Sequence, residues 1–348
     1  MSIQARTAEL TGVRRFQLSE RSVGDPGPGE VQVRIAAVGV CGSDLHSYSE
    51  GAVGDSPCVY PMVLGHEPAG VVATTGPGVT GWSPGDRAAF EPALSCYHCE
   101  FCLSGHHNVC ANLRFMSNPD EPGFFREYTN LPAGNLIAIP HGISLEHATL
   151  VEPLAVVLHS LQLGSIQPGE TAAVFGVGPI GLLTVVALKL AGAGRVWAID
   201  PVAHRLELAR IVGVDIVIDP RAVDPAQQIL SDTGKRGVDV AIDCGGKDGS
   251  INQCANTTRN AGRLVVTAIQ PGIDTPVNLH TMRRKEITVF NVRRSNHESA
   301  AALAMLAEHT ARFAPIITHS RPLDEISRVF AQLENYEDGL GKVVITCR

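Results

Sequence analysis

The sequence lacks several features that would assign it to whole classes of protein. No stretch approaches the ~18 uninterrupted apolar residues that a membrane-spanning helix needs. The first residues, Met-Ser-Ile-Gln-Ala-Arg, contain no apolar segment typical of an export signal. Lys and Arg form no long run and the net charge is −7, which disfavours binding to a phosphate backbone. These absences predict a cytoplasmic protein that binds neither membranes nor nucleic acids.

Cysteine, in contrast, is concentrated at one place. Four of the nine cysteines fall within fifteen residues, at Cys96, Cys99, Cys102 and Cys110. The CxxCxxCx7C spacing on a short polar loop is typical of a closed structural zinc site, in which the metal folds a segment poor in apolar residues. An iron–sulfur cluster is the alternative thiolate site. Two disulfides are disfavoured because the chain is not expected to reach an oxidising compartment.

The length of 348 residues predicts two domains, and the first part of the chain has the pattern of β structure. Val31, Val33 and Ile35 alternate with polar residues, as in a half-buried strand. Gly70–Thr74 and Arg87–Phe90 fit the same description, with Gly-Pro and Pro-Gly turns between them. We therefore expect a compact antiparallel β unit in this region.

From about residue 156 the pattern changes to alternating strands and helices, which predicts a doubly wound parallel sheet of an α/β fold. The expected strands are 171–175, 195–200, 216–218, 238–243, 263–267 and 287–290, and the first two helices are 180–191 and 203–211. A helix near 326–333 and a strand at 342–345 need not belong to that sheet.

A dinucleotide motif lies at the first strand–helix junction of this second region. Gly176, Gly178 and Gly181 form GxGxxG, with Pro179 and Ile180 opening the helix. Such glycines permit a tight turn and a close approach to a pyrophosphate, whose charge lies at the helix N-terminus. Asp200 ends the second strand, where a carboxylate binds the adenosine ribose and repels a 2′-phosphate, so NAD is favoured over NADP. The alternative is a Gly-rich turn that binds another nucleotide or none; Arg205 either flanks the adenine or is a solvated helix residue.

A second group of chemically active side chains lies in the first region. Cys41, Ser43, Asp44 and His46 follow the first expected strand, and Gly65-His66-Glu67 follows Pro61-Met62-Val63-Leu64. Residues 65–79 match the GHExxGx5GxxV signature of the zinc-containing medium-chain dehydrogenases. The four-cysteine array and the glycine motif occur in that family in the same order. The chain therefore resembles this family over essentially its whole length.

The resemblance implies a domain organisation. We expect a GroES-like β domain over residues 1–155 and 292–348, including a structural zinc lobe at about 93–112. A Rossmann NAD-binding domain is expected over residues 156–291, with the active site in the cleft between the domains. Members of the family are commonly homodimers or homotetramers.

The resemblance also implies roles for the residues of the first region. Cys41 and His66 match catalytic zinc ligands, and Glu67 or Glu152 completes the protein set. Ser43 matches the hydroxyl that takes the substrate proton, His46 the end of the relay toward solvent, and Asp44 the carboxylate that orients the ligand imidazole. Zinc lowers the pKa of a bound alcohol, and the cofactor accepts the hydride.

The residue type at position 152 indicates which branch of the family the chain resembles. Polyol and threonine dehydrogenases carry Glu or Asp there, whereas simple alcohol dehydrogenases carry Cys, and the sorbitol dehydrogenase branch is the most similar. Matching positions imply substrate contacts at Ser47, Phe115, Glu152 and Arg293, and cofactor contacts at Thr267, Ala268, Ile269, Val292 and Arg293. Ser47 and Arg294 replace tyrosines of that branch, so the resemblance does not indicate which polyol is the substrate.

The expected reaction is zinc- and NAD-dependent oxidation of a secondary alcohol in a polyol or a sugar-derived substrate. Oxidation of a 3-hydroxy amino acid, a sugar acid or an amino-sugar alcohol is the alternative within enzymes. An inactive NAD-binding regulator is disfavoured because Cys41, Ser43, His66 and Glu67 are all present.

Overall fold

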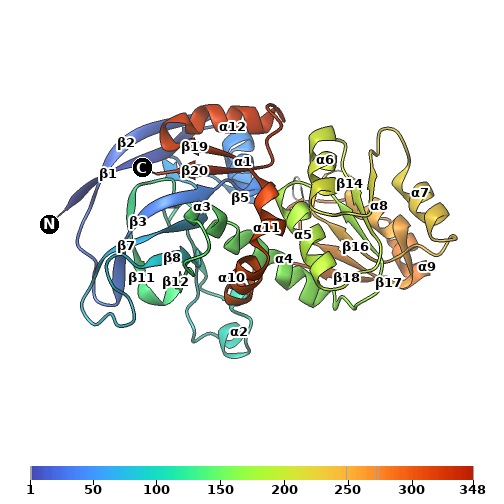
Figure 1. The fold of residues 1–348 in the computed structure, drawn as a ribbon, viewed down its shortest axis with the longest axis horizontal. Coiled ribbons are helices and arrows are strands. Elements are labelled where there is room, and N and C mark those ends of the chain that lie inside the picture. Colours follow the sequence, from blue (N-terminus) through green and yellow to red (C-terminus); the bar gives the residue numbers. More distant parts are fainter. Residues whose placement is uncertain (1, 248, 271, 273, 348) are drawn as a thin grey trace. The chain divides into compact units, whose positions relative to one another are not determined.

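The computed structural model of the chain describes residues 2–247, 249–270, 272 and 274–347, and these form two compact units (Figure 1). Unit 1 comprises residues 1–152, 299–310 and 317–348, and unit 2 comprises residues 153–298 and 311–316. Residues 292–298 and 311–316, which the resemblance assigns to the GroES-like domain, belong here to unit 2. Among the described residues, no helix has both the length and the apolar character that crossing a membrane requires.

Unit 1 is built on a seven-stranded sheet whose strands are antiparallel except for the last pair. The order is β12 (Leu136–Ala138), β8 (Arg87–Phe90), β7 (Glu67–Thr75), β3 (Glu30–Gly39), β20 (Lys342–Thr346) and β19 (Ile317–Pro322), and β11 (Tyr128–Pro132) also pairs with β3. The C-terminal strand β20 therefore belongs to this sheet and not to the parallel one. A smaller sheet has the order β2 (Arg15–Val23), β1 (Ile3–Gly12) and β6 (Met62–Val63).

Strand β3 is the centre of unit 1 and differs from the expected half-buried strand. Val31, Val33 and Ile35 are fully buried as the alternation predicts, but Gln32 is also only 3% exposed. Its amide donates to the carbonyl of Gly24 at 3.0 Å, which satisfies a polar group that burial would otherwise leave unpaired. Side chains on both faces of β3 are thus buried at residues 31–33, whereas Arg34 is exposed.

The remaining elements of unit 1 are short. The helices are α1 (Gly42–Glu50), α2 (Glu100–Leu103), α3 (Leu145–Ala148), α10 (Ser299–Glu308) and α12 (Ile326–Glu334), with 3-10 turns at His107–Val109, Ala133–Asn135 and Leu323–Glu325. Two small hairpins pair β4 (Ala52–Val53) with β5 (Ser56–Pro57), and β9 (Ala93–Leu94) with β10 (Arg114–Phe115). Helix α12 buries Ile326, Val329 and Phe330 in the same core as β3.

Unit 2 contains a six-stranded parallel sheet, as expected. Its order is β15 (Ile216–Ile218), β14 (Val196–Ile199), β13 (Ala172–Phe175), β16 (Val238–Asp243), β17 (Thr258–Val266) and β18 (Thr288–Asn291). Chain order reverses between β13 and β16, and open α/β sheets bind ligands at such a switch point. The α/β fold class predicted from the sequence is confirmed.

The helices of unit 2 connect these strands. They are α5 (Pro179–Leu190), α6 (Ala203–Ile211), α7 (Pro225–Asp232), α8 (Ser250–Thr257) and α9 (Leu279–Lys285); α4 (Val151–Leu163) begins in unit 1, and α11 (Thr310–Phe313) with the 3-10 turn Ala314–Ile316 lies near the second boundary. Helix α5 is apolar almost all round, and its residues 181–188 are buried. A helix of that composition belongs in a core rather than at a surface.

Candidate active site and metal centres

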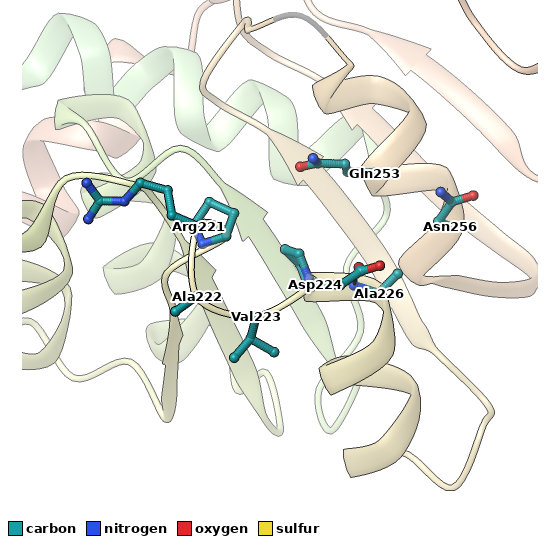
Figure 2. Close-up of a pocket in the computed structure, with 9 residues that line it drawn as sticks. Arg221, Ala222, Val223, Asp224, Ala226, Gln253 and Asn256 are labelled. Carbon is teal, nitrogen blue, oxygen red and sulfur yellow. Dashed lines mark hydrogen bonds between the residues drawn. The ribbon is translucent and has the colours of Figure 1, made fainter.

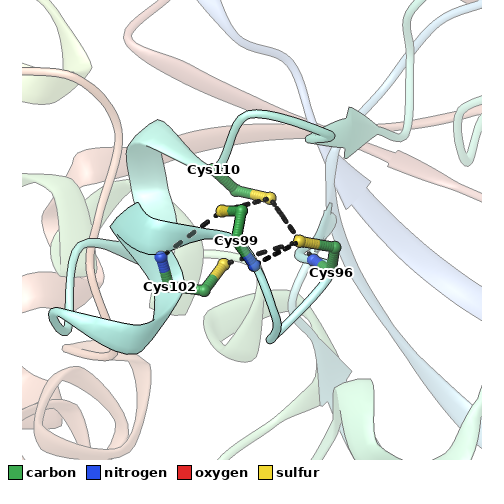
Figure 3. A group of neighbouring side chains, drawn as sticks. All are labelled: Cys96, Cys99, Cys102 and Cys110. Carbon is green, nitrogen blue, oxygen red and sulfur yellow. Dashed lines mark hydrogen bonds between the residues drawn. The ribbon is translucent and has the colours of Figure 1, made fainter.

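The four cysteines lie together in a lobe formed by residues 96–110. Helix α2 and the 3-10 turn His107–Val109 fold back on each other, so that the four sulfurs face one another (Figure 3). The Sγ–Sγ distances are 3.4 Å for Cys96–Cys110, 3.9 Å for Cys99–Cys110 and 4.0 Å for Cys96–Cys102. Zn–S bonds of ~2.3 Å in a tetrahedron require sulfurs roughly 3.8 Å apart. All nine cysteines are free, so no disulfide competes with a metal.

Backbone N–H groups also favour the thiolate form of Cys96 and Cys99, whereas burial and the neighbouring thiols raise the pKa of Cys102 to about 12. Cys99 N donates to Cys96 Sγ at 3.4 Å, and Cys102 N donates to Cys99 Sγ at 3.5 Å. The N–H of His98 and the amide of Asn112 lower the pKa of the Cys96 thiol to about 5. Thiolates are the form that binds zinc, so this lobe suits a closed structural zinc ion.

A second potential metal site lies at the adjoining ends of β3 and β7. Gly39 pairs with Glu67 across these antiparallel strands, which brings Cys41, just beyond β3, next to His66 and Glu67. The ligand atoms of Cys41, His66 and Glu67 all lie within 4.8 Å of one another. His66 is 6% exposed and Glu67 is 1% exposed, and Glu67 Oε1 has no hydrogen-bond partner among the described residues. A thiolate, an imidazole and an unsatisfied carboxylate oxygen are a donor set that suits zinc.

Asp44, on helix α1, contacts and orients the residues that form this site. Its Oδ2 accepts from Cys41 N at 3.1 Å, and its Oδ1 accepts from Gly65 N at 3.1 Å and from Ser117 Oγ at 3.3 Å. Oδ1 also lies 3.4 Å from His66 Nδ1, which leaves His66 Nε2 to face a metal. Burial opposes the charge of Asp44, but the His66 ring and these N–H groups outweigh burial and lower the pKa of the carboxyl.

The two residues predicted to move the proton also lie on α1. Ser43 Oγ is 3.5 Å from His66 Nε2, which places the hydroxyl beside the potential metal ligand. His46 is one helical turn further along the same face, and its Nδ1 contacts Glu50 Oε1 at 2.8 Å. The His46 side chain is 28% exposed, so its ring reaches solvent.

Glu152 lies in the first turn of α4 and differs from Glu67 in its surroundings. It is absent from the cluster of possible ligands formed by Cys41, His66 and Glu67. Burial raises the pKa of its carboxyl to about 8, and the neighbouring charges of Glu67 and Glu91 act in the same direction. Without metal, this carboxyl is therefore mainly protonated at neutral pH.

The residues predicted to contact substrate lie in different surroundings. Phe115 lies beside the site, with its ring centroid 5.4 Å from that of His66. Ser47 is 4% exposed, and its carbonyl accepts from Cys58 Sγ at 3.8 Å. Arg293 is exposed and follows β18 in unit 2.

The dinucleotide motif of unit 2 has the geometry that its glycines suggest. Gly176 has a φ of +82°, and a side chain there would collide with the backbone of Gly245. Gly178 is the N-cap of α5, and Pro179 opens that helix. The first N–H groups of α5 are thus available for a pyrophosphate.

Asp200 is 2% exposed at the carboxyl end of β14, where it orders the glycine turn. Its Oδ2 accepts from Val177 N at 2.9 Å, and its Oδ1 accepts from Val202 N at 2.8 Å. Arg205 Nη1 lies 3.7 Å from Asp200 Oδ2, and its guanidinium also approaches Gly178. The structure thus places Arg205 at the glycine turn.

Asp243, which the sequence analysis did not single out, organises the neighbouring loops. It is fully buried at the end of β16, and it accepts hydrogen bonds from Gly245 N, Gly246 N, Ser250 Oγ and Gln270 Nε2 at 2.7–3.2 Å. The N–H groups of Thr267 and Ala268 bond to its carbonyl, and Ile269 packs on Gly246. A carboxylate that ends a buried strand, as Asp200 does, was the sequence signal for this role.

A separate hollow of about 330 Å³ lies at the end of β15 in unit 2 (Figure 2). Its walls are residues 220–226 with Gln253 and Asn256, and none of the predicted site residues lines it. Arg221 at its rim is paired with Asp219. The hollow is therefore distinct from both metal clusters, which belong to unit 1.

Comparisons with known proteins agree with this geometry. Residues 27–141 match the alcohol dehydrogenase GroES-like domain, and residues 179–308 match the zinc-binding dehydrogenase domain. The chain is 31% identical over 340 residues to a sorbitol dehydrogenase of Bacillus subtilis (strain 168), covering 98% of this chain and 96% of that one. It is 33% identical over 335 residues to a sorbitol dehydrogenase of Homo sapiens, covering 95% and 93%.

A solved structure shows the same likeness in three dimensions. A zinc-binding dehydrogenase of Sinorhizobium meliloti 1021 bound to NADP superposes with a TM-score of 0.90 at 30% identity, covering 99% of each chain. The resemblance inferred from the sequence and the expectation of zinc and a nicotinamide dinucleotide as cofactors are thus confirmed. The chain belongs to the zinc-containing alcohol dehydrogenases of the medium-chain family, near sorbitol dehydrogenase, and is an oxidoreductase.

Proposed function

We propose that the protein oxidises a secondary alcohol of a polyol or a sugar-derived substrate to the ketone, with zinc at Cys41 and His66 and with NAD as hydride acceptor. The observation that carries this proposal is the convergence of Cys41, His66 and Glu67 with a serine hydroxyl 3.5 Å from His66 Nε2. When bound, zinc polarises the substrate hydroxyl and NAD takes the hydride.

The chain itself supplies the path for the proton. Ser43 Oγ is placed to accept the proton of the substrate hydroxyl, because it lies beside the ligand ring of His66. His46, one turn along α1 and partly exposed, delivers that proton toward solvent. Glu50 holds the His46 ring at 2.8 Å and thereby keeps the end of the relay in one orientation.

We infer that Glu67, rather than Glu152, is the resting carboxylate ligand. Glu67 lies within 4.8 Å of both Cys41 and His66, and one of its oxygens has no partner among the residues described. Glu152 is not part of that cluster of possible ligands among the described residues.

The cofactor preference follows from Asp200. Its carboxylate is buried at the strand end, where ribose hydroxyls bind in this fold, and it carries negative charge toward a 2′-phosphate. We therefore propose NAD rather than NADP as the physiological cofactor. The glycine turn and the loops ordered by Asp243 bind and orient the dinucleotide.

A substrate screen tests the proposed function. Purified, zinc-loaded enzyme with NAD is mixed with hexitols, pentitols, threonine and sugar acids, and NADH is followed by absorbance. We expect turnover with at least one polyol and none in a Cys41→Ser variant. Turnover restricted to threonine or to a sugar acid would move the substrate class to the alternative, and no turnover with any alcohol would contradict the proposal.

We also propose that the protein is a cytoplasmic homodimer or homotetramer with a small-molecule substrate. All nine cysteines are free, and a zinc site made of four thiolates needs a reducing compartment. Strand β18 is an edge strand of the unit 2 sheet, and Val289 on it is 38% exposed. An exposed apolar edge strand favours pairing with a second copy, which light scattering coupled to size exclusion measures directly.

A further inference from the structure

Residues 292–298 follow β18 in unit 2 and form neither a helix nor a strand. Arg294 has a φ of +54° and His297 has a φ of +74°, in the left-handed region that residues other than glycine rarely adopt. Backbone of this kind persists only where its surroundings hold it in place, and it is concentrated at ligand-binding sites. The segment therefore depends on contacts that fix its conformation.

Glu298 supplies such contacts at the end of the segment. Its Oε2 accepts a hydrogen bond from Asn296 N, and its Oε1 accepts one from Nδ1 of His159, on α4, at 2.9 Å. The side chains of His159 and Glu298 are 10% and 11% exposed. Burial opposes the charge of Glu298, but the hydrogen bonds from His159 and Asn296 outweigh burial and lower the pKa of the carboxyl. The carboxylate of Glu298 thus links the segment to helix α4.

Helix α4 also holds the chain that follows the neighbouring strand, β17. Thr267 Oγ1 donates to Ser160 Oγ at 3.0 Å, so two consecutive residues of α4 bond to the segments after β17 and β18. Val292 N donates to the carbonyl of Val266 at 2.9 Å, which aligns the ends of these two strands. One helix therefore sets the position of both segments.

These segments lie on the side of the sheet that is away from the adenosine site. Asp200, at the end of β14, marks the adenosine side of the switch point between β13 and β16. A dinucleotide binds across that switch point, so its nicotinamide half belongs on the side of β16, β17 and β18. Val292 and Arg293 directly follow β18, and the resemblance implies that both contact the cofactor.

We propose that His159 and Glu298 form a clasp that holds residues 292–298 in the conformation that places Val292 and Arg293 against the nicotinamide half of the cofactor. His159 is a positioning residue in this clasp, because it acts on the segment through Glu298. This inference rests on the cofactor site of the proposed function. The clasp forms before the cofactor binds, so binding does not have to supply the free energy of ordering the segment.

Hydrogen–deuterium exchange of the full-length protein without ligands tests the clasp directly. His159→Leu removes the donor and keeps an apolar side chain in its place, so we expect faster exchange at residues 292–298. His159→Asn keeps an N–H donor near the position of Nδ1 and should retain slow exchange. Ser160→Ala is the matched control, because it removes the neighbouring bond to Thr267 and should leave exchange at residues 292–298 unchanged.

Titrations with NADH and with ADP-ribose, which lacks the nicotinamide, separate positioning from general damage to unit 2. His159→Leu should weaken NADH binding about tenfold, as expected if the ordered segment falls to about a tenth of the population. Binding of ADP-ribose should not change, since the adenosine site lies on the other side of the sheet. His159→Asn should bind NADH as the unaltered protein does.

Glu298→Ala removes the other partner and provides a second route if His159→Leu does not fold. We expect a similar loss of NADH affinity, and His159→Leu should add nothing in the Glu298→Ala background. Slow exchange with full NADH affinity in a folded His159→Leu or Glu298→Ala variant would overturn the proposal. Equal losses of affinity for NADH and ADP-ribose would overturn it as well. Failure of alcohol oxidation with these binding results as expected would overturn only the proposed function.

Discussion

In the candidate sites, hydrogen bonds to neighbouring residues decide which side-chain atoms remain available to a ligand. Asp44 occupies His66 Nδ1 and the N–H groups of Cys41 and Gly65, which leaves His66 Nε2 facing the position of a metal and of Ser43. Asp200 in unit 2 uses both of its oxygens to order the turn at Val177 and Val202. Each carboxylate therefore prepares a site before any ligand arrives.

Replacing Ser43 by Ala should separate chemistry from binding. We expect kcat to fall by about 10²–10⁴-fold, the usual contribution of a positioned acid–base group, while zinc content and NAD affinity stay nearly unchanged. The matched control is Ser49→Ala, because within the described part of the chain Ser49 Oγ on the same helix bonds only to the carbonyl of Leu45, at 2.8 Å. Full kcat in the Ser43→Ala variant, with a deuterium isotope effect showing that hydride transfer limits the rate, would exclude the relay.

Replacing Asp200 by Ala should reduce the preference for NAD over NADP. The ribose loses its acceptor and a 2′-phosphate loses its repulsion, so the ratio of kcat/KM for the two cofactors should fall by at least tenfold, or about 1.4 kcal/mol. Affinity for both should also weaken, since Val177 N loses its acceptor. Glu207→Ala, which removes a charge from an exposed pair with Arg210 on α6, is the control. Equal ratios before and after Asp200→Ala would contradict this assignment.

At the scale of elements, Asp239 joins the starts of three strands in unit 2. It is 6% exposed and is the second residue of β16, after Val238. It accepts from Thr171 N and Oγ1 before β13, from Arg259 in β17 and from Arg236, at 2.6–3.0 Å. Burial opposes its charge, but the Arg236, Thr171 and Arg259 hydrogen bonds outweigh burial and hold its pKa well below the usual range.

The stability of unit 2 should consequently depend on pH through Asp239. Because its folded pKa is lowered, its contribution is present above the unfolded pKa of about 3.9 and is lost as the pH falls toward the folded value. Asp239→Asn should lower the free energy of unfolding by about 1–3 kcal/mol at pH 7, toward the lower figure since Arg236 is half-exposed and screened by solvent.

The difference between Asp239→Asn and the unaltered protein should be constant from about pH 5 to 7 and shrink below pH 4. Denaturant unfolding at several pH values measures this difference. Asp219→Asn, which breaks a more exposed local pair with Arg221, is the matched control and should show little change. A difference for Asp239→Asn that grew on acidification would contradict the assignment.

For the whole molecule, the two metal clusters differ in how completely the protein encloses the ion. Four cysteines close one cluster, whereas the other has three donors among the described residues, from Cys41, His66 and Glu67. We expect two zinc ions per chain and expect mild chelation to remove the zinc at Cys41 and His66 first. Metal analysis during dialysis against a chelator measures both the number and the order.

Cysteine variants identify which cluster holds each zinc ion. Cys41→Ser should lack the easily removed zinc, and Cys99→Ser should lack the other and lose stability, because the lobe at residues 96–110 depends on its metal. A single zinc ion that persists in Cys41→Ser and disappears in Cys99→Ser would show that no metal binds at His66.

The sequence was informative wherever the residues of a predicted site are close together along the chain. The four cysteines fall within fifteen residues, and the strand–glycine–helix pattern of residues 171–191 is continuous. Local spacing of this kind predicts a metal lobe and a dinucleotide turn, because neighbouring residues cannot move far apart. The alternation of strands and helices likewise predicted the parallel sheet of unit 2.

The tertiary structure alone decided which distant side chains meet and which of them lose water. The pair of Lys342 with Glu67 depends on β20 and β7 flanking β3 at Gly39, and a charged residue at the start of an apolar strand does not by itself show its partner. The raised pKa of Glu152 and the buried bonds of Asp243 likewise result from burial and neighbours that the fold supplies. Local patterns determine the elements, whereas strand register and desolvation determine the contacts between residues far apart in the sequence.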